Sequence, residues 1–124
     1  DVIQADAGTR TAAITGAWIA LQACCTELLK KGILKKNPVI NQVAAVSVGL
    51  VEGTPLLDLD YREDSKAEVD FNVVMDSNSN FLELQGTAEG APFSRQKLDA
   101  LLDLAEPAIQ TLHGAQRAVL KKQG

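Results

Sequence analysis

The sequence predicts an α+β domain in which helices pack on a mixed or antiparallel β-sheet. A helical pattern near the N-terminus, a succession of strand-like segments and a second long helical pattern at the C-terminus indicate this class. With 124 residues, 46% of them hydrophobic, the chain can bury one compact core. We therefore expect residues 1–124 to form a single domain with the element order β-α-β-β-β-β-α, the first strand lying at residues 1–6.

Two helices are predicted from apolar side chains that recur every three or four residues. In the first, which should end at residues 30–32, small side chains flank the apolar stripe, so we expect it to pack closely against the sheet. Its apolar stripe is Ile14, Trp18, Leu21, Cys25 and Leu28, and the small residues are Ala13, Gly16, Ala17 and Ala20. In the second helix, Ser94 is a good N-cap and Pro107 should cause a kink or a break. Its expected buried face is Leu98, Leu101, Leu102, Ala105, Ile109, Leu112 and Val119.

Four strands are predicted between the helices. Residues 43–51 are nearly all apolar, which is typical of a central strand covered on both faces. A tight turn at residues 52–55 leads to an alternating segment from Leu57 to Tyr61. A third strand alternates from Val69 to Met75, and a polar turn at residues 76–80 leads to a fourth at residues 81–87.

Charge, cysteine content and hydropathy restrict the function classes. Sixteen acidic and 12 basic residues give a net charge of −4, so the totals do not favour nucleic acid binding by this segment alone. The adjacent Cys24 and Cys25 cannot form an unstrained disulfide, which predicts buried, reduced thiols in a cytoplasmic protein. The longest uncharged stretch, residues 11–26, is too short to span a bilayer, so we expect no membrane association.

Gly8-Thr9-Arg10-Thr11 lies where a strand is expected to give way to a helix. Unpaired backbone N–H groups and the helix dipole favour an anion at such a junction, and Arg10 adds a two-pronged cationic donor. On these residues alone, a helix cap with a solvated arginine is the preferred interpretation.

Asp64 and Asp70 are carboxylates six residues apart, beside the start of the third strand. They could bind a divalent cation or divide metal binding and proton transfer between them, although on spacing alone a solvated charged loop is the preferred interpretation. His113, the single histidine, has no metal-type partner nearby in the sequence, so we expect a packing or surface residue instead of a catalytic base.

Read together, these segments resemble the C-terminal half of the ribonuclease PH family over essentially the whole chain. The blocks that carry the resemblance, in the family's order, are residues 1–6, 8–12, 14–17, 43–49, 58–61, 63–65, 72–75 and 85–90. The resemblance implies a phosphorolytic 3′→5′ exoribonuclease, or tRNA nucleotidyltransferase, that trims tRNA precursors with inorganic phosphate and releases nucleoside diphosphates. It also implies a cytoplasmic homo-oligomeric ring, and an N-terminal half of the same enzyme as a partner.

By position, the resemblance assigns phosphate binding to Gly8, Thr9 and Arg10, and Mg²⁺ or Mn²⁺ binding to Asp64 and Asp70. Arg10 and Asp64 are then the catalytic candidates, with Asp64 as metal ligand or as acid toward the leaving 3′-oxygen. The family usually has glycine where this chain has Ala7, which would strain the phosphate loop by roughly 1–2 kcal/mol if that position needs a positive φ. The alternative function is a non-catalytic structural subunit of an exosome-like ring.

Overall fold

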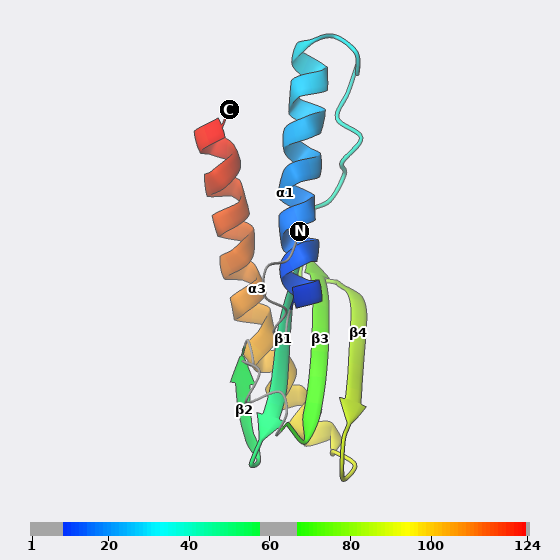
Figure 1. The fold of residues 1–124 in the computed structure, drawn as a ribbon, viewed down its shortest axis with the longest axis vertical. Helices are drawn as coiled ribbons and strands as arrows, with labels where there is room; N and C mark the ends of the chain where they lie inside the picture. The colour runs from blue at the N-terminus through cyan, green and yellow to red at the C-terminus, as the bar shows by residue number, and fades with distance from the viewer. Residues whose placement is uncertain (1–8, 58–66, 124) are drawn as a thin grey trace.

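A four-stranded antiparallel sheet with two helices forms the described part of the chain, residues 9–57 and 67–123 of the computed structural model. This arrangement confirms the α+β class (Figure 1). The sheet order is β2-β1-β3-β4, and every pairing among the described strands is antiparallel, so the mixed alternative does not apply to them. The strand predicted at residues 1–6 lies outside the described residues. In chain order the elements are α1 (Thr9–Lys30), β1 (Val43–Val51), β2 (Thr54–Leu57), β3 (Val69–Asp76), β4 (Phe81–Ala88) and α3 (Arg95–Gln123).

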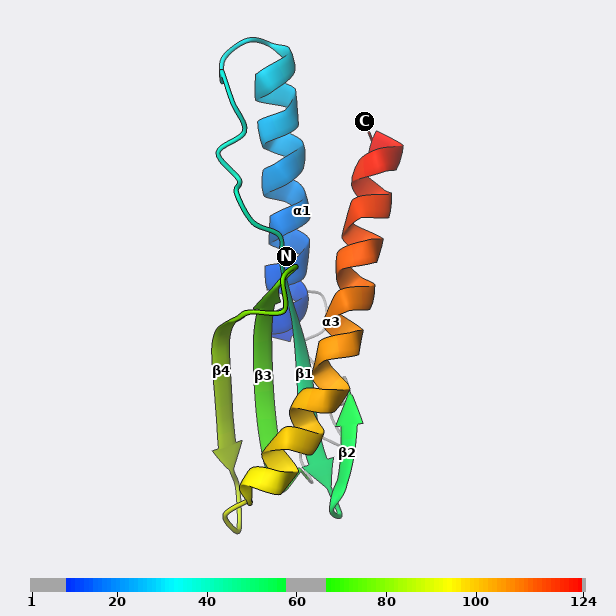
Figure 2. The same cartoon turned by 180° about the vertical axis from the view of Figure 1, so that it is seen from behind.

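Strand β1 lies between β2 and β3 and is buried along nearly its whole length, as its apolar sequence predicts. Successive side chains on β1 and β3 point to opposite faces of the sheet. One face packs against α3, which crosses the sheet in Figure 2. The hydrophobic core on that side consists of Ala44, Val46, Val48, Leu50, Val69, Phe71, Val73, Met75, Leu101, Ala105 and Ile109.

Two tight turns connect neighbouring strands. Glu52 and Gly53 have φ angles of 53° and 76°, so a two-residue loop of the mirror-image type joins β1 to β2. Strand β2 therefore begins at Thr54, inside the segment that was expected to be turn, and the rest of the predicted strand lies outside the described residues. At the β3–β4 turn, the Asp76 carboxylate accepts hydrogen bonds of 2.9 Å from the backbone N–H groups of Asn78 and Asn80.

Helix α3 begins as predicted, since the Ser94 hydroxyl accepts a hydrogen bond of 3.2 Å from the backbone N–H of Lys97. Of the kink or break predicted at Pro107, the break does not occur, because a single helix runs through this residue. Pro107 is exposed, so its ring faces away from the packed side of the helix. The predicted buried face is correct except at its end, where Val119 is exposed because α3 extends past the sheet (Figure 1).

Helix α1 ends where the sequence predicts. Gly32, with φ of 76°, and Ile33 donate backbone hydrogen bonds to Leu29 and Leu28, which closes the helix with a left-handed cap. Only the first turns of α1 lie on the sheet, and the remainder extends beyond it (Figure 1). The predicted close packing on the sheet is therefore wrong for most of its length. Leu21 and Cys24 are exposed instead of buried, whereas Cys25 is buried, and the small residues Ala13, Gly16, Ala17 and Ala20 are also exposed.

The same helix qualifies, by length and composition, as a membrane span. Among the described residues one segment, Arg10–Lys30, meets that test, contrary to our expectation from its uncharged stretch of residues 11–26. Core helices of globular proteins are equally apolar. The composition of α1 therefore does not distinguish a membrane-spanning helix from a helix that packs against another part of a protein.

A buried polar cluster connects both helices to β1. Gln116 of α3, 1% exposed, donates hydrogen bonds of 3.0 and 2.9 Å to the backbone carbonyls of Thr15 and Val43. Its side-chain oxygen accepts from Gln42 and contacts Nδ1 of His113 at 3.1 Å. His113 is therefore a buried packing residue within this cluster, in agreement with the packing or surface role predicted for it.

Candidate active site on the sheet face opposite α3

The sheet face opposite α3 is rich in polar side chains and receives the first turns of α1. We call it the polar sheet face. The Thr15 hydroxyl accepts a hydrogen bond of 3.0 Å from the backbone N–H of Ala45, which anchors α1 over β1. The strand register and the alternation of side chains place on this face, among others, Ala45, Ser47 and Gly49 of β1, Asp70, Asn72 and Val74 of β3, and Glu83, Gln85 and Thr87 of β4.

Arg10 lies at the start of α1, where it forms an ion pair with Glu83 of β4. Arg10 Nη1 is 2.7 Å from Glu83 Oε1, and Nη2 donates a hydrogen bond of 2.9 Å to Oε2. This hydrogen bond, and then the opposite charge, lower the pKa of Glu83 and raise the pKa of Arg10. The guanidinium is therefore held in one place on the polar sheet face while about half of its side chain stays accessible to solvent.

Asp70 lies on the same face, half-buried near the start of β3, opposite Gly49 of β1 and Thr87 of β4. Two residues further along β3, Asn72 accepts a hydrogen bond of 2.8 Å from the buried hydroxyl of Ser47. Thr87 and Glu83 are four residues apart on β4, which separates their backbone positions by about 13 Å. Asp70 and the Arg10–Glu83 pair thus lie near opposite ends of one polar strip that contains Ser47 and Asn72.

The structure brings Arg10 and Asp70 to one face and leaves the other predicted site residues untested. Gly8, Asp64 and the departure at Ala7 lie outside the described residues. Thr9 is the first residue of α1, which supports the predicted helix start, but its side chain is not described. Within residues 9–57 and 67–123, no group of three or more histidine, cysteine, aspartate or glutamate side chains is placed to bind a metal.

Sequence reasoning did not find Glu83 as the partner of Arg10, nor the contact between Ser47 and Asn72. The sequence does mark the positions, because Ser47 interrupts the apolar run of β1 and Glu83 is a charged residue within β4, but it does not mark the pairings. The pairing of Glu83 with Arg10, 73 residues away in the chain, required the sheet register and the placement of α1, which local patterns do not contain.

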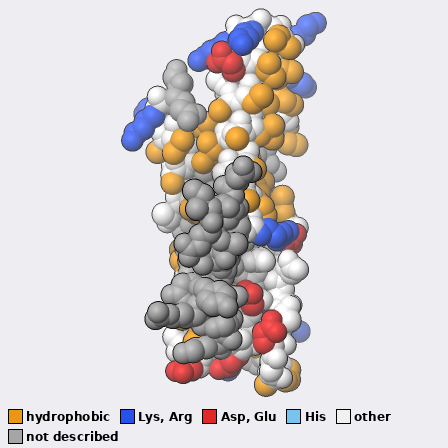
Figure 3. Space-filling view, in the orientation of Figure 1, with side chains coloured by type: hydrophobic (Ala, Val, Ile, Leu, Met, Phe, Trp, Pro, Cys, Tyr) orange, Lys and Arg blue, Asp and Glu red, His pale blue; other side chains and the backbone are white. Residues whose placement is uncertain are grey.

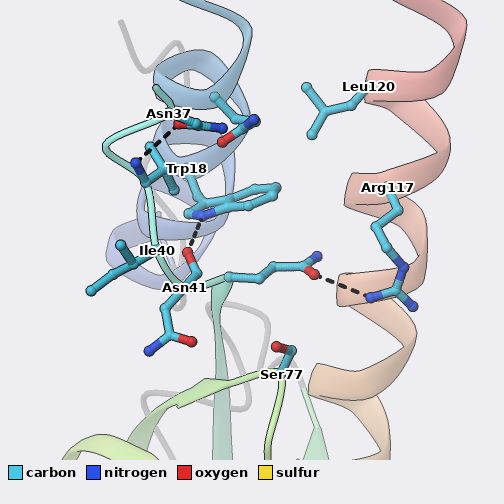
Figure 4. A pocket seen from close by; sticks show the side chains of 10 residues that line it. Trp18, Asn37, Ile40, Asn41, Ser77, Arg117 and Leu120 are labelled. Carbon is cyan, nitrogen blue, oxygen red and sulfur yellow. Dashed lines mark hydrogen bonds between the residues drawn. The ribbon is translucent and has the colours of Figure 1, made fainter. Parts of the chain in front are cut away.

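A separate cavity of about 330 Å³ lies between α1, α3 and the segment before β1 (Figure 4). Trp18 donates a hydrogen bond of 2.8 Å to the backbone carbonyl of Asn41, and Arg117 donates one of 3.1 Å to Gln42. Neither Arg10 nor Asp70, the predicted site residues whose side chains the structure describes, lines this cavity. Its polar groups mainly fasten the two helices to the segment between them, so the polar sheet face is the better candidate for chemistry.

Residues 41–108, which include the whole sheet and the first half of α3, match the model of the 3′ exoribonuclease family, domain 2. The chain belongs to this family. Helix α1, with Arg10, precedes the matched region. Asp70 and Glu83 of the polar sheet face therefore lie within the region that matches the family model. Arg10 lies outside that region, but within the part of the chain that aligns with full-length relatives.

Those relatives are ribonucleases PH. The chain is 68% identical over 123 residues to ribonuclease PH of Prochlorococcus marinus (strain MIT 9313), covering 99% of this chain and 50% of that protein. It is 65% identical over 117 residues to ribonuclease PH of Synechococcus sp. (strain CC9605), covering 94% of this chain and 47% of that protein. The chain thus spans about half the length of the family members it matches.

Two solved structures share the fold. Rice (Oryza sativa) Rrp46 superimposes with a TM-score of 0.59 at 20% identity, covering 82% of this chain and 46% of that chain. The archaeal exosome core gives a TM-score of 0.57 at 21% identity, covering 65% of this chain and 32% of that chain. At this level of identity the likeness establishes the architecture of the sheet and helices alone.

Proposed function

We propose that this chain is the C-terminal half, residues 1–124, of a cytoplasmic phosphate-dependent 3′→5′ exoribonuclease that trims the 3′ ends of tRNA precursors. Inorganic phosphate replaces water as the attacking group, and nucleoside diphosphates are released. One observation carries the proposal: in a chain that belongs to the 3′ exoribonuclease family, Arg10 and Asp70 lie on the same polar sheet face. A cation for the phosphate and a carboxylate for a metal are the two groups that such a transfer needs.

The reaction joins two anions, the attacking phosphate and the phosphodiester of the RNA. A phosphate oxygen bonds to the phosphorus of the terminal nucleotide while the 3′-oxygen of the preceding nucleotide leaves and takes up a proton. In this proposal Arg10, with Gly8 and Thr9, holds the phosphate in line with that bond and offsets its charge. Asp64 supplies the proton to the leaving 3′-oxygen or serves as a metal ligand.

The residues around Asp70 suit a hard divalent cation. Its carboxylate has oxygen-bearing side chains beside it on the polar sheet face, from Asn72 on the same strand and Thr87 on β4. Mg²⁺ and Mn²⁺ prefer such oxygen donors, and Mg²⁺ is often bound by one or two carboxylates with several waters. Asp70 and Asp64 would hold the ion, and when bound it would neutralise charge that develops on the phosphoryl oxygens.

The exposed side of α1 supports an N-terminal half of the same enzyme as the partner. Hydrophobic side chains gather along this helix in Figure 3. It precedes the region matched by the domain 2 family model, and the matched relatives are about twice as long as this chain. An exposed apolar helix face usually marks a surface that another structural element or protein covers. We propose that the other half covers α1 and that the complete enzyme assembles into a homo-oligomeric ring.

The experiment compares variants of the complete enzyme, made by joining or co-expressing this chain with an N-terminal half. Release of nucleoside diphosphates from a 3′-tailed RNA is measured at several phosphate concentrations. Arg10→Gln should raise the KM for phosphate, and Asp70→Asn should reduce kcat sharply at all Mg²⁺ concentrations. Arg95→Gln and Asp99→Asn, on exposed positions of α3, are the matched controls and should behave like the unmodified enzyme.

The 124-residue chain alone should release no nucleoside diphosphate, and addition of the N-terminal half should restore the activity. An assembled complex that remains inactive with every RNA and with both metals would contradict the proposal and would favour the structural subunit. Activity of the isolated chain at a rate comparable to the complex would show that this half carries the whole site.

A further inference from the structure

We propose that Glu83 is a positioning residue for Arg10: its carboxylate holds the guanidinium so that one edge of it stays available to phosphate. This inference rests on the proposed function, because it concerns the same phosphate site. Glu83 itself would not contact the reacting groups. It would act through Arg10.

The geometry of the pair supports this role. Arg10 Nη2 donates a hydrogen bond of 2.9 Å to Glu83 Oε2, and Nη1 lies 2.7 Å from Oε1 as the second contact of the ion pair. The hydrogen bond uses one N–H of Nη2. A guanidinium has five N–H donors, so the edge formed by Nε and Nη2 keeps two parallel donors. That edge has the geometry that matches two oxygens of a phosphate.

The surroundings of the pair argue against a purely structural function. The side chains of Arg10 and Glu83 are 51% and 38% exposed, and ion pairs this accessible contribute little to stability. The start of α1 is also attached to the sheet independently, through the hydrogen bonds between Thr15 and Ala45. The pair nevertheless orients a long and flexible side chain toward one strand, which a free arginine would achieve only by losing conformational freedom.

The charges explain which kinetic constant should change. A paired arginine and glutamate are neutral together, so Glu83 does not increase the attraction of distant anions. Its contribution is orientation, and orientation matters at the short distance where phosphate binds Arg10. Removal of the Glu83 carboxylate should therefore raise the KM for phosphate and leave the KM for RNA unchanged.

The test uses the active complex described above. Glu83→Gln removes the negative charge that pairs with Arg10 and places an amide NH₂ where a carboxylate oxygen was, so the ion pair is lost. We expect the KM for phosphate to rise by about tenfold, which corresponds to ~1.4 kcal/mol, with the KM for RNA unchanged. Glu52→Gln, the same chemical change in the exposed β1–β2 turn, is the matched control and should leave both constants unchanged.

A double-variant cycle separates positioning from a general structural effect. If Glu83 acts through Arg10, then Glu83→Gln introduced into an Arg10→Gln enzyme should cause no further rise in the KM for phosphate. An equal rise in both backgrounds would overturn the inference, as would an unchanged KM in Glu83→Gln. If Glu83→Gln fails to fold, Glu83→Asp carries the same measurement, because it keeps the charge but withdraws the carboxylate from the guanidinium.

The outcomes also separate this inference from the proposed function. An Arg10→Gln enzyme with normal phosphate dependence would refute the phosphate site itself. A strong effect of Arg10→Gln together with no effect of Glu83→Gln would refute only the positioning role. Thermal denaturation of each variant checks that the changes in KM do not follow from loss of folded enzyme.

Discussion

Gly86 of β4 lies directly opposite Phe71 of β3, and the ring of Phe71 occupies the space that a side chain at position 86 would need. A methyl group there would overlap the ring. The ring has little freedom to move, since Phe71 is 6% exposed and packs edge-on against Phe93 with ring centroids 5.8 Å apart. Gly86→Ala should therefore displace both aromatic rings and destabilise the fold.

The magnitude follows from two opposing effects. Overpacking of a well-packed core costs typically ~1–3 kcal/mol, and displacement of two coupled rings places this case toward the upper end. Replacing glycine in a strand by alanine returns roughly 0.5–1 kcal/mol, because the unfolded chain loses conformational freedom. The net loss in unfolding free energy should be about 2 kcal/mol, or about 8 °C in Tm for a domain of this size.

Urea denaturation followed by circular dichroism measures the effect. Gly90→Ala is the matched control, because a side chain there would meet no atom within 4 Å, and it should leave stability nearly unchanged. In a Phe71→Leu background, Gly86→Ala should cost less than it does with Phe71 present. If Gly86→Ala and Gly90→Ala have the same stability, the ring is not the obstacle and the argument fails.

Two further predictions concern the buried polar groups. Gln116→Leu should lower the unfolding free energy by about 2–3 kcal/mol, because the carbonyls of Thr15 and Val43 lose buried donors; urea denaturation measures this, with exposed Gln96→Leu as the control. The hydrogen bond from the backbone N–H of Asn80 lowers the pKa of Asp76 in the folded protein. The ionised Asp76 therefore contributes fully to the unfolding free energy above the ordinary carboxyl pKa, and this contribution is lost as the pH falls through the lower pKa of the folded state. Urea midpoints measured from neutral to acid pH should decrease less steeply in Asp76→Asn.

Local patterns in the sequence predicted most of the fold. The alternation in β3, the apolar run of β1 and the Ser94 cap all correspond to observed elements, because each depends on near neighbours in the chain. Leu21 and Val119 were predicted to be buried but are exposed. Helical spacing shows that an apolar face exists, but it does not show how far the sheet beneath it extends.

The candidate site was predicted only in part. Arg10 and Asp70 were identified through the family resemblance, because charge and spacing alone allowed solvated alternatives. Their common location on the polar sheet face depends on strand register, and the contact between Arg10 and Glu83 joins positions 73 residues apart. Such pairings arise from the tertiary arrangement and leave no local pattern to detect.

Strand β4 is an edge of the described sheet, and its far side presents backbone N–H and C=O groups that no described strand pairs. Phe81, Leu82 and Leu84 are exposed along it, and its one charged side chain, Glu83, is engaged by Arg10. Edges that stay monomeric usually carry free charges or prolines that discourage another strand from adding. This edge lacks them, so self-association by strand addition should increase with protein concentration, and it should increase further in any variant that weakens the remaining charge at position 83.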